Sequence, residues 1–599
     1  MDLKNSYIMF GQNTSPLLII SSAVLVLTLF FYIHTVGSYF EIGISPLVDR
    51  ETQHTAFAVY IIDKSIDQII TAAGIVVWLA LSVTGKARIV TSATYGVITA
   101  AAIWTGPSIV FDIVALISFP IAISLLIYNR FATKKILNVN TKLLLNYLAI
   151  AGIATGIVGI ITSLAPLFSI PPESFLVRDY AFDIFLLLSS LSPVIIFFLI
   201  IYSPIKLLVK KSTAEISKTR NETSLSNGII KPRTRVLCLL LFMLLSVALA
   251  LIPHSPLTND ASQLVSADSV EYVETLNKLA QSNNPQEFLT EAFTTFSGDR
   301  PLALIFLYAI ASAVPTDPLY AIDHVSIILG PALVLATFFL TRELTSNDTT
   351  SILASFLAAI SFQTLIGIYS GIYANWLAII IGYLSFVFLI RFLKVQGKRN
   401  LAMYWILLIL LLFSHTYTWT ILAMVTGIFL VVMYKLNHYH KKTMIILLLV
   451  LLSSVAIDVA KTSLTGTGGI ERDVGIARVS AGPEQSVLLW NNLTEATQSY
   501  AGGQLSNFML LALGIYWILR ARLQDLSGIF LLVFFSIGVI PLLFGNYIIQ
   551  ARVLYDIPFQ IPAAIALTFM MKKKNGALIV LPICIWLFAM SVRMSSNFT

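Results

Sequence analysis

The stretch VLCLLLFMLLSVALALI, residues 236–252, continues into PHSPLTNDASQLVSADSVEYVETLNKLA, residues 253–280, so that an apolar run leads directly into an acidic polar loop. Within the loop, carboxylates recur at the helical spacing of three, beside a neighbouring apolar face. The carboxylates are those of Asp268, Glu271 and Glu274, and the apolar residues are Val270, Val273, Leu276 and Leu279. The pattern predicts an amphipathic helix that lies on a membrane surface.

Composition extends the membrane interpretation to the whole chain. Of the 599 residues, 57% are hydrophobic and 11% are charged, whereas about 25% are charged in soluble proteins. Apolar runs of roughly 17 to 25 residues, the length that crosses about 30 Å of hydrocarbon, recur from Pro16 to Met590. We therefore predict an all-α polytopic membrane protein with about 17 transmembrane helices and an external amphipathic-helix loop. Cys238 and Cys584 both lie in apolar runs, which excludes a disulfide framework or a cysteine-rich metal site.

The formal net charge of +8 indicates topology rather than a nucleic-acid partner, because the basic residues cluster at the ends of apolar runs. By the positive-inside rule, these clusters and the N-terminus are cytoplasmic, which places the interval 253–300 outside. The intervals 38–67, 169–180 and 461–506 are external by the same argument. One short segment, Pro301 to Val314, fits this scheme only if it does not cross alone, as a re-entrant or interfacial helix would not.

The chain divides into two predicted modules. Residues 1–209 form an N-terminal module of about six transmembrane helices, to which the sequence assigns no function. Residues 210–235 are rich in Ser, Thr, Asn and basic residues and are predicted to form a cytoplasmic linker. Residues 236–599 form the second module. The two modules show no internal repeat, which argues against an inverted-repeat transporter.

From residue 236 to about 592, a series of short motifs resembles, in its order, the polytopic C-type glycosyltransferases (GT-C), the superfamily that includes protein mannosyltransferases, aminoarabinose transferases and oligosaccharyltransferases. Asp268 and Tyr272 match the acidic residue and following aromatic of the family's first external loop. Pro301 opens an apolar segment as in the family, and Arg342 lies in a turn before the Ala-rich SILASFLAAIS. Later, QARVLYDIPFQIPAAIAL, residues 550–567, resembles the family's proline-punctuated segment with an arginine and an aromatic.

The resemblance implies transfer of a sugar from a polyprenyl-phosphate-linked donor to a glycan, lipid or protein acceptor on the external face, as in cell-envelope glycosylation. Asp268 would be the catalytic base or would orient the acceptor; its alternative role is that of a helix N-cap. Arginine suits the departing phosphate, which makes Arg300 and Arg552 candidates, although Arg552 could also anchor its helix at the interface.

The remaining candidate residues carry less defined roles. Glu271 could complete a capping arrangement or help to hold a divalent metal, so a metal cofactor is possible but not certain. His415 could bind phosphate or acceptor, or could simply be a satisfied interfacial histidine. Tyr272 and Tyr555 are substrate-binding candidates by the same resemblance.

Two other functions remain open at this point. A lipid or glycan transporter or flippase would place charged residues near the centres of its spans. Asp458 is the main exception to the apolar span centres, and Lys461 is positioned to pair with it. A non-catalytic membrane assembly subunit could keep the fold without the chemistry. The partners expected in every case include membrane lipid and exclude nucleic acid.

Overall fold

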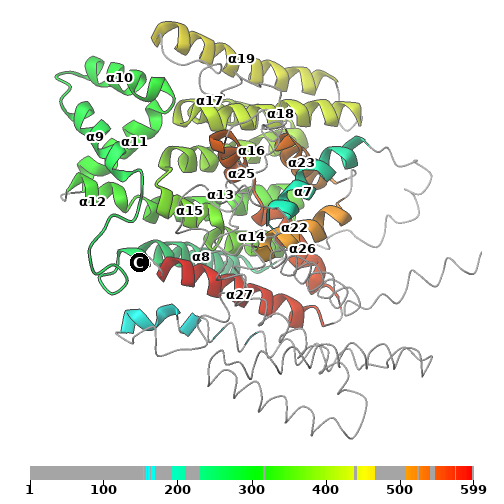
Figure 1. Cartoon of the computed structure of the whole chain (residues 1–599). Helices are drawn as coiled ribbons and strands as arrows, with labels where there is room; N and C mark the ends of the chain where they lie inside the picture. The colour runs from blue at the N-terminus through cyan, green and yellow to red at the C-terminus, as the bar shows by residue number, and fades with distance from the viewer. Residues whose placement is uncertain are drawn as a thin grey trace, which may run out of the picture. The chain divides into compact units, whose positions relative to one another are not determined.

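A computed structural model describes residues 192–208, 230–314, 317–436, 441–465, 508–521, 525–539, 547–573 and 575–596, with a few residues between 153 and 168 (Figure 1). Most of them belong to one compact unit, which includes Ser189–Lys574 and Leu587–Thr599, and the description below concerns that unit. The described residues contain helices and no strand. Most of the predicted N-terminal module lies outside them.

The described α-helices are between six and 25 residues long. The elements up to the end of the loop are α7 (Ser192–Leu208), α8 (Pro232–Leu251), η4 (Ile252–His254), α9 (Ser269–Ala280), α10 (Pro285–Thr294), η5 (Thr295–Gly298), α11 (Pro301–Ala313) and α12 (Pro318–Asp323). They are followed by α13 (Ser326–Thr345), α14 (Asp348–Ala359), α15 (Phe362–Ser370), α16 (Tyr373–Val395), α17 (Lys398–Ser414), α18 (Thr416–Lys435) and α19 (Lys441–Thr465). The last are α22 (Phe508–Arg520), α23 (Leu526–Ile537), α25 (Tyr547–Asp556), α26 (Gln560–Met571) and α27 (Ala577–Ser596).

Seven of the described segments are long and apolar enough to cross a membrane. They are Pro232–His254, Pro318–Thr345, Asp348–Ser370, Tyr373–Val395, Thr416–Lys435, Lys441–Leu464 and Ala577–Ser596. The prediction of a helical, integral membrane protein is therefore confirmed in this part of the chain. The total of about 17 spans is not, because the described residues cover only part of the sequence.

The short segment after the polar loop forms α11, a helix of 13 residues. At about 1.5 Å per residue it is roughly 20 Å long, less than the ~30 Å of hydrocarbon that a spanning helix must cross. Leu304 and Leu307 are buried, and α11 contacts α9, α10, α12, α16 and α17. Protein therefore surrounds a helix that cannot cross a bilayer by itself.

Helix α16 lies at the centre of the long helices and contacts α13, α17 and α18. Gly382 allows α18 to approach closely, since a Cβ at this position would lie 2.2 Å from Leu422 Cδ1. Phe386 packs its ring edge-on against Phe530 of α23, with centroids 5.0 Å apart. Small residues facing large ones are typical of helix packing within membranes, where apolar surface alone gives no driving force.

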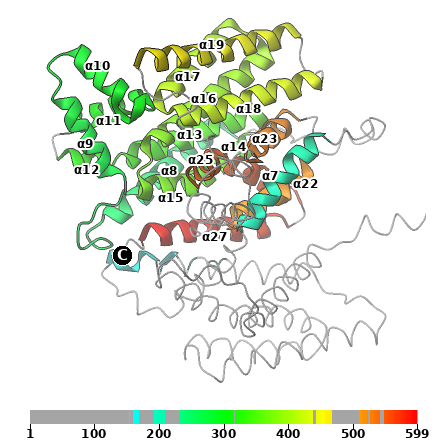
Figure 2. The same cartoon turned by 45° about the horizontal axis from the view of Figure 1, so that its top comes forward.

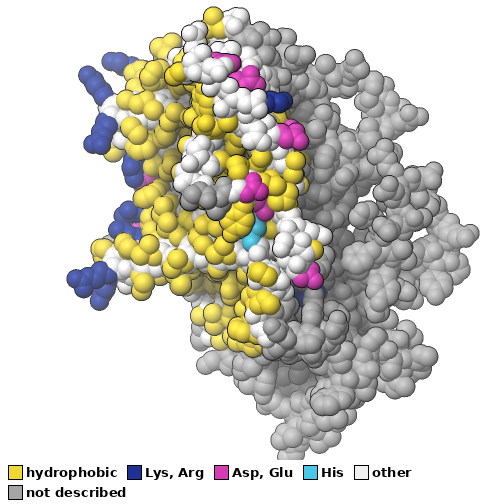
Figure 3. Space-filling model, turned by 90° about the vertical axis from the view of Figure 1, so that its left-hand side faces the viewer, with side chains coloured by type: hydrophobic (Ala, Val, Ile, Leu, Met, Phe, Trp, Pro, Cys, Tyr) yellow, Lys and Arg dark blue, Asp and Glu magenta, His cyan; other side chains and the backbone are white. Residues whose placement is uncertain are grey.

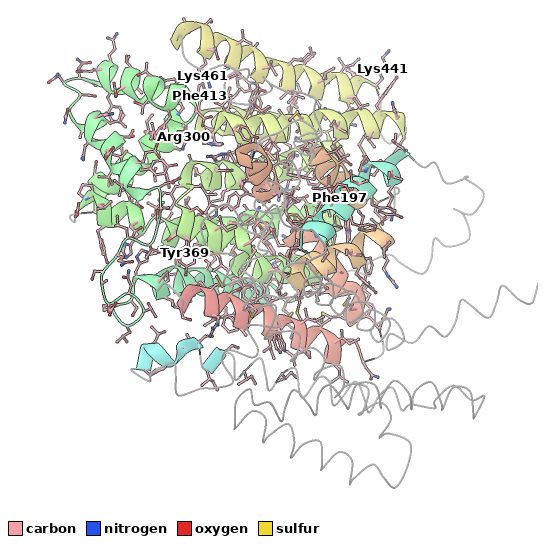
Figure 4. All side chains as sticks on the ribbon, viewed as in Figure 1. Phe197, Arg300, Tyr369, Phe413, Lys441 and Lys461 are labelled. Carbon is pink, nitrogen blue, oxygen red and sulfur yellow. The ribbon has the colours of Figure 1, made fainter. Side chains whose placement is uncertain are left out.

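Charged side chains pair at one end of these helices. Asp348, at the start of α14, lies 3.2 Å from both Arg235 of α8 and Arg342 of α13. Nearby, Arg391 of α16 lies 2.7 Å from Glu343. The polar loop leaves α8 at the opposite end, and Figure 4 shows Lys441 and Lys461 at the two ends of α19, with Arg300 on the Lys461 side. Among the described residues, Arg235, Arg342 and Arg391 therefore lie at the end of the bundle opposite to the acidic loop.

Helices α9, α10, α11 and α12 gather at that second end (Figures 1 and 2). The buried residues of α9 include Tyr272, Leu276 and Leu279, and the helix contacts α10, α11 and α12. The prediction that α9 lies on a membrane surface through its apolar face is therefore wrong for that face, which is covered by protein. Val270, assigned to this face, is instead 46% exposed, because the buried stripe is centred on Tyr272.

Candidate functional site

Asp268 lies in a short loop whose backbone is fixed by hydrogen bonds to Asp323 and Ser370. The carboxylate of Asp323, at the end of α12, accepts hydrogen bonds from the backbone N–H groups of Val265 and Ser266 at 3.2 and 2.9 Å. It also accepts one from Ser269 Oγ at 3.2 Å. On the other side, the Asp268 N–H donates to Ser370 O at 3.3 Å. These contacts fix the backbone on both sides of Asp268.

The side chain of Asp268 is less constrained than its backbone. The residue occupies the N-cap position of α9, but its carboxylate makes no capping hydrogen bond. The residue is half-buried, and no other described residue forms a hydrogen bond or ion pair with its carboxylate. Burial, followed by the charge of Glu271, raises the pKa of Asp268, whereas Arg300 and Arg552 act to lower it. The hypothesis that Asp268 serves only as a helix cap is therefore not supported by the geometry.

Gly371 allows the turn between α15 and α16 to approach this loop. Its φ is +67°, and a Cβ there would lie 2.2 Å from Ser266 Oγ and 3.3 Å from Asp268 Cβ. Gly371→Ala is expected to lower the free energy of unfolding by roughly 2–4 kcal/mol, from the left-handed backbone and the overpacking together. Unfolding of the purified protein in detergent micelles measures the change. Gly397→Ala is the control, since a Cβ there would meet only Asn400 Nδ2, at 3.5 Å; equal losses in both variants would contradict the prediction.

Arg300 lies between the group of helices α9 to α12 and the long helices (Figure 4), and its charge acts on Asp268. Its Nη1 donates to Tyr272 Oη at 3.3 Å, and its Nη2 lies 3.4 Å from Asp299 Oδ2. The guanidinium also stacks on the Phe296 ring, 4.5 Å from its centroid. The side chain is 18% exposed. A permanently charged group is thus fixed in orientation close to the Asp268 carboxylate.

Asp299 balances the positive charge at this position. It is 8% exposed, and its carboxylate lies 3.4 Å from both Arg300 Nη2 and His415 Nε2. Burial acts to raise the pKa of Asp299, but His415 and the charges of Arg300, Arg552 and Lys461 outweigh it, so the pKa is lowered. Asp299 O also accepts a hydrogen bond from Thr416 N at 2.9 Å. The residue therefore joins the polar loop to the start of α18.

His415 separates α17 from α18 and caps the second helix. Its Nδ1 accepts a hydrogen bond from Thr418 N at 3.2 Å, which places the ring proton on Nε2, facing Asp299. Burial lowers the pKa of His415 to about 3, although Asp299 opposes the shift. The ring is therefore neutral at physiological pH. Because it is only 1% exposed, it contacts other residues of the site rather than solvent.

Arg552 reaches the cluster from α25. Its Nη1 donates to Asn375 Oδ1 at 3.2 Å and lies 3.4 Å from His415 Nε2. Asn375 Nδ2 in turn donates to Asp556 Oδ1 and to Thr418 Oγ1, both at 2.8 Å. Because Asp556 and Thr418 hold the amide nitrogen, the amide oxygen is turned toward the guanidinium. Arg552 remains half-buried, so it is more accessible than His415.

The other three candidates occupy different positions. Tyr272 is 2% exposed, and its Oη accepts hydrogen bonds from Arg300 Nη1 at 3.3 Å and from Ala374 N at 3.4 Å. Glu271 is exposed on α9, one turn beyond Asp268. Tyr555 is fully buried and donates to Gln363 O at 2.6 Å, within a deeper polar group that includes Tyr383. Its hydroxyl is therefore engaged away from Arg552.

Asp268, Arg300, His415 and Arg552 are thus brought together from four separate parts of the chain, and Tyr272 joins them through Arg300. Lys461 reinforces the group from α19: it lies 3.2 Å from Asp458, as the sequence predicts, and donates to Thr416 Oγ1 at 2.8 Å.

Sequence analysis missed four residues that organise the site. Asp299 directly precedes Arg300, and Asp556 lies in the same stretch, 550–567, as Arg552, whereas nothing in the local sequence distinguishes Asp323 or Asn375. The first two could have been found by asking which carboxylates balance the charges of Arg300 and Arg552.

The arrangement can accept a proton at Asp268 and stabilise negative charge at Arg300 and Arg552. It is not closed around a metal: in the part of the chain that the structure describes, Asp268 and Glu271 have no third ligand of the His, Cys or carboxylate type in a joint cluster. The space-filling view of this end shows carboxylates and a histidine scattered among apolar side chains (Figure 3).

Of the comparisons with known proteins, the one with solved structures finds similar chains. No protein-family model and no curated protein sequence matches this chain. Among solved structures, it is similar to the archaeal oligosaccharyltransferase AglB from Archaeoglobus fulgidus, determined in complex with an inhibitory peptide and a dolichol-phosphate. The identity is 16%, the TM-score is 0.40, and the match covers 61% of this chain. The match extends over 56% of AglB, so the chain parallels little more than half of that protein.

Proposed function

We propose that this protein is a membrane glycosyltransferase that moves a sugar from a polyprenyl-phosphate-linked donor to an acceptor at the face of the membrane that carries the acidic loop. The observation that carries the proposal is the state of Asp268. Its carboxylate is half-buried, makes no hydrogen bond to another described residue, and lies within the electrostatic influence of Arg300 and Arg552. Because this carboxylate neither caps α9 nor pairs with a described residue, none of the described contacts assigns it a role in the fold.

In the proposed reaction, a nucleophilic group of the acceptor attacks the anomeric carbon of the donor sugar. The bond between that carbon and the phosphate oxygen breaks, the new glycosidic bond forms, and Asp268 takes the acceptor's proton. The lipid phosphate leaves with negative charge. Arg552, half-buried and aligned by Asn375, is the candidate for binding it, and Arg300 adds fixed positive charge.

The transporter alternative has less support from the placement of charge. In the seven described candidate spans, the Asp, Glu, Lys and Arg residues lie toward the ends of the segments, and Asp458, six residues before the end of Lys441–Leu464, lies furthest inside. A carrier of polar cargo would be expected to place some of them near the middle.

A direct experiment separates these functions. The purified protein is incubated with synthetic polyprenyl-phosphate sugars and candidate acceptors, and glycosylated products are detected by mass spectrometry. In parallel, liposomes containing the protein are tested for translocation of the fluorescent donor lipid. Transfer supports the proposal, whereas translocation without transfer from any donor contradicts it and favours the carrier.

The pH dependence of transfer should report on Asp268. Activity is lost on the acid side, as the carboxylate gains a proton and can no longer accept one. Because burial and Glu271 raise the pKa of Asp268, this loss is expected above the ordinary value of 3.8. Glu271→Gln removes one of the two causes and should move the acid limb to lower pH. Glu274→Gln, also exposed on α9, is the control; an acid limb that Glu271→Gln leaves unmoved would argue against Asp268 as the titrating group.

A further inference from the structure

His254, Asp323 and His324 form a compact group outside the site described above. One ligand atom from each residue lies within 4.8 Å of the others, and it is the only group of three or more His, Cys, Asp or Glu with this geometry among the described residues. His254 ends η4, at the end of α8 from which the polar loop departs. Asp323 ends α12, and His324 follows it directly. The group therefore connects two elements that are distant in sequence.

Asp323 is a buried carboxylate without a basic partner of the usual kind. It is 4% exposed, and no Lys or Arg of the described residues forms an ion pair with it. The nearest group able to balance its charge is His254, whose Nδ1 lies 3.3 Å from Asp323 Oδ2. Buried carboxylates are as a rule paired with a cation or bound to a metal. A separation of 3.3 Å also matches the distance between two ligand atoms on a tetrahedral ion with bonds of about 2.0 Å.

Both imidazoles have a nitrogen suited to a metal. His324 Nδ1 lies 2.9 Å from Tyr320 O, a carbonyl that can only accept, so the proton is on Nδ1 and Nε2 carries a lone pair. A backbone carbonyl on the second ring nitrogen is the usual support of a metal-bound histidine. In His254 the nitrogen that faces Asp323 Oδ2 is Nδ1, at 3.3 Å, so Nδ1 is the candidate ligand atom. Nε2, which is buried and has no hydrogen-bond partner among the described residues, would then carry the ring proton.

The two rings are stacked, with centroids 3.9 Å apart and planes inclined by 24°. Two imidazoles bound to one tetrahedral ion have centres about 5 Å apart. Binding would therefore draw the rings apart by about an ångström and weaken the contact of His324 with the Tyr320 ring, whose centroid lies 4.0 Å away. This movement needs no change in the backbone, because His324 is only half-buried.

We propose that His254, Asp323 and His324 bind a divalent transition metal of the zinc class. Two imidazoles and one carboxylate favour such an ion over Mg²⁺ or Ca²⁺, which prefer oxygen ligands. These three ligands would leave the fourth position of a tetrahedral ion to water. The ion would join the end of α8 to α12, and Asp323 would pass the constraint to the loop that carries Asp268 through Val265, Ser266 and Ser269.

The test uses the full-length protein in detergent, purified without a histidine tag and stripped with a chelator. Co²⁺ is the spectroscopic probe, and Zn²⁺ is the competitor. The wild type should bind one Co²⁺ with the visible absorption of a tetrahedral site, lose it to Zn²⁺, and unfold at higher temperature with Zn²⁺ present. His254→Ala and His324→Ala should each remove the absorption and the thermal shift.

The control is a His438→Ala/His440→Ala variant, which removes the two histidines that stand closest together in the sequence and could collect metal adventitiously. It should keep the wild-type absorption and thermal shift. If His324→Ala folds normally and retains the full cobalt signal, or if the wild type shows no thermal shift with Zn²⁺, the proposal is wrong. Neither readout uses glycosyl transfer, so failure here leaves the proposed function untouched, and failure of that function leaves the metal site to be judged by itself.

Discussion

Asp268→Asn is expected to reduce glycosyl transfer by at least about 100-fold, since removing a general base typically costs two to four orders of magnitude. The substitution keeps the shape of the side chain and removes only its charge and its ability to accept a proton. Product formation from a polyprenyl-phosphate sugar, followed under initial-rate conditions, measures the loss. Because chemistry rather than binding is affected, the decrease should appear mainly in kcat.

The Asp268→Asn variant is expected to fold as the wild type does. The Asp268 carboxylate caps nothing and pairs with no other described residue, so its replacement should change the free energy of unfolding by less than about 0.5 kcal/mol. Glu274→Gln, an equivalent change at an exposed position on the same helix, should alter neither stability nor rate. If Asp268→Asn transfers sugar as fast as the wild type, the site assignment fails, whereas a destabilised but active variant would instead indicate that Asp268 supports the fold.

The sequence predicts the positions of apolar helices well, because the length and composition of each run follow directly from the thickness of a bilayer. It also finds the short helix α11 correctly, from the conflict between Pro301 to Val314 and the charge pattern. It is less accurate for α9. The helical period of α9 is compatible with two buried faces, one through Val270 and one through Tyr272. The face of Tyr272 is the buried one, because its hydroxyl contacts Arg300 inside the protein. A tyrosine on the polar side of a helix gives no such indication by itself.

The residues of the candidate site could likewise be predicted from the sequence only in part. Arg300 and Arg552 stand out in the sequence because the charge pattern predicts them on the side of the membrane where the positive-inside rule expects few cations. Their supporting residues do not stand out. Asn375 matters only because Asp556 and Thr418 fix its amide nitrogen, so that its oxygen faces Arg552. These contacts join residues 43 to 181 positions apart, and no local pattern encodes them.

The role of Asp323 could not be predicted from the sequence. In the sequence it is one aspartate near the start of a helix, with no motif around it. In the structure it receives hydrogen bonds from three residues of the loop before α9 and thereby determines where Asp268 lies. The catalytic candidate can be recognised from its residue type and position, but the residue that positions it is recognised only from the fold.

Asp299→Ala is expected to destabilise the protein by about 3–5 kcal/mol, the usual cost of removing one partner from a buried ion pair. Asp299 is 8% exposed and stands between Arg300 and His415, so its loss leaves the positive charge of Arg300 without its ion-pair partner. Unfolding in mixed detergent micelles measures the change. Glu343→Ala is the control: its partners Arg391 and Lys394 are 37% and 33% exposed, so the loss should be about 1 kcal/mol or less.

A second substitution separates charge from packing. In Asp299→Ala/Arg300→Leu the unpaired cation is gone, and an apolar side chain replaces its aliphatic stem, so part of the lost stability should return. Transfer activity should not return, because Arg300 contributes positive charge beside Asp268 in the proposed reaction. If the double variant is less stable than Asp299→Ala by the full effect of a second independent substitution, the two side chains do not act as a pair. The buried charge at this position would then need another explanation than compensation between Asp299 and Arg300.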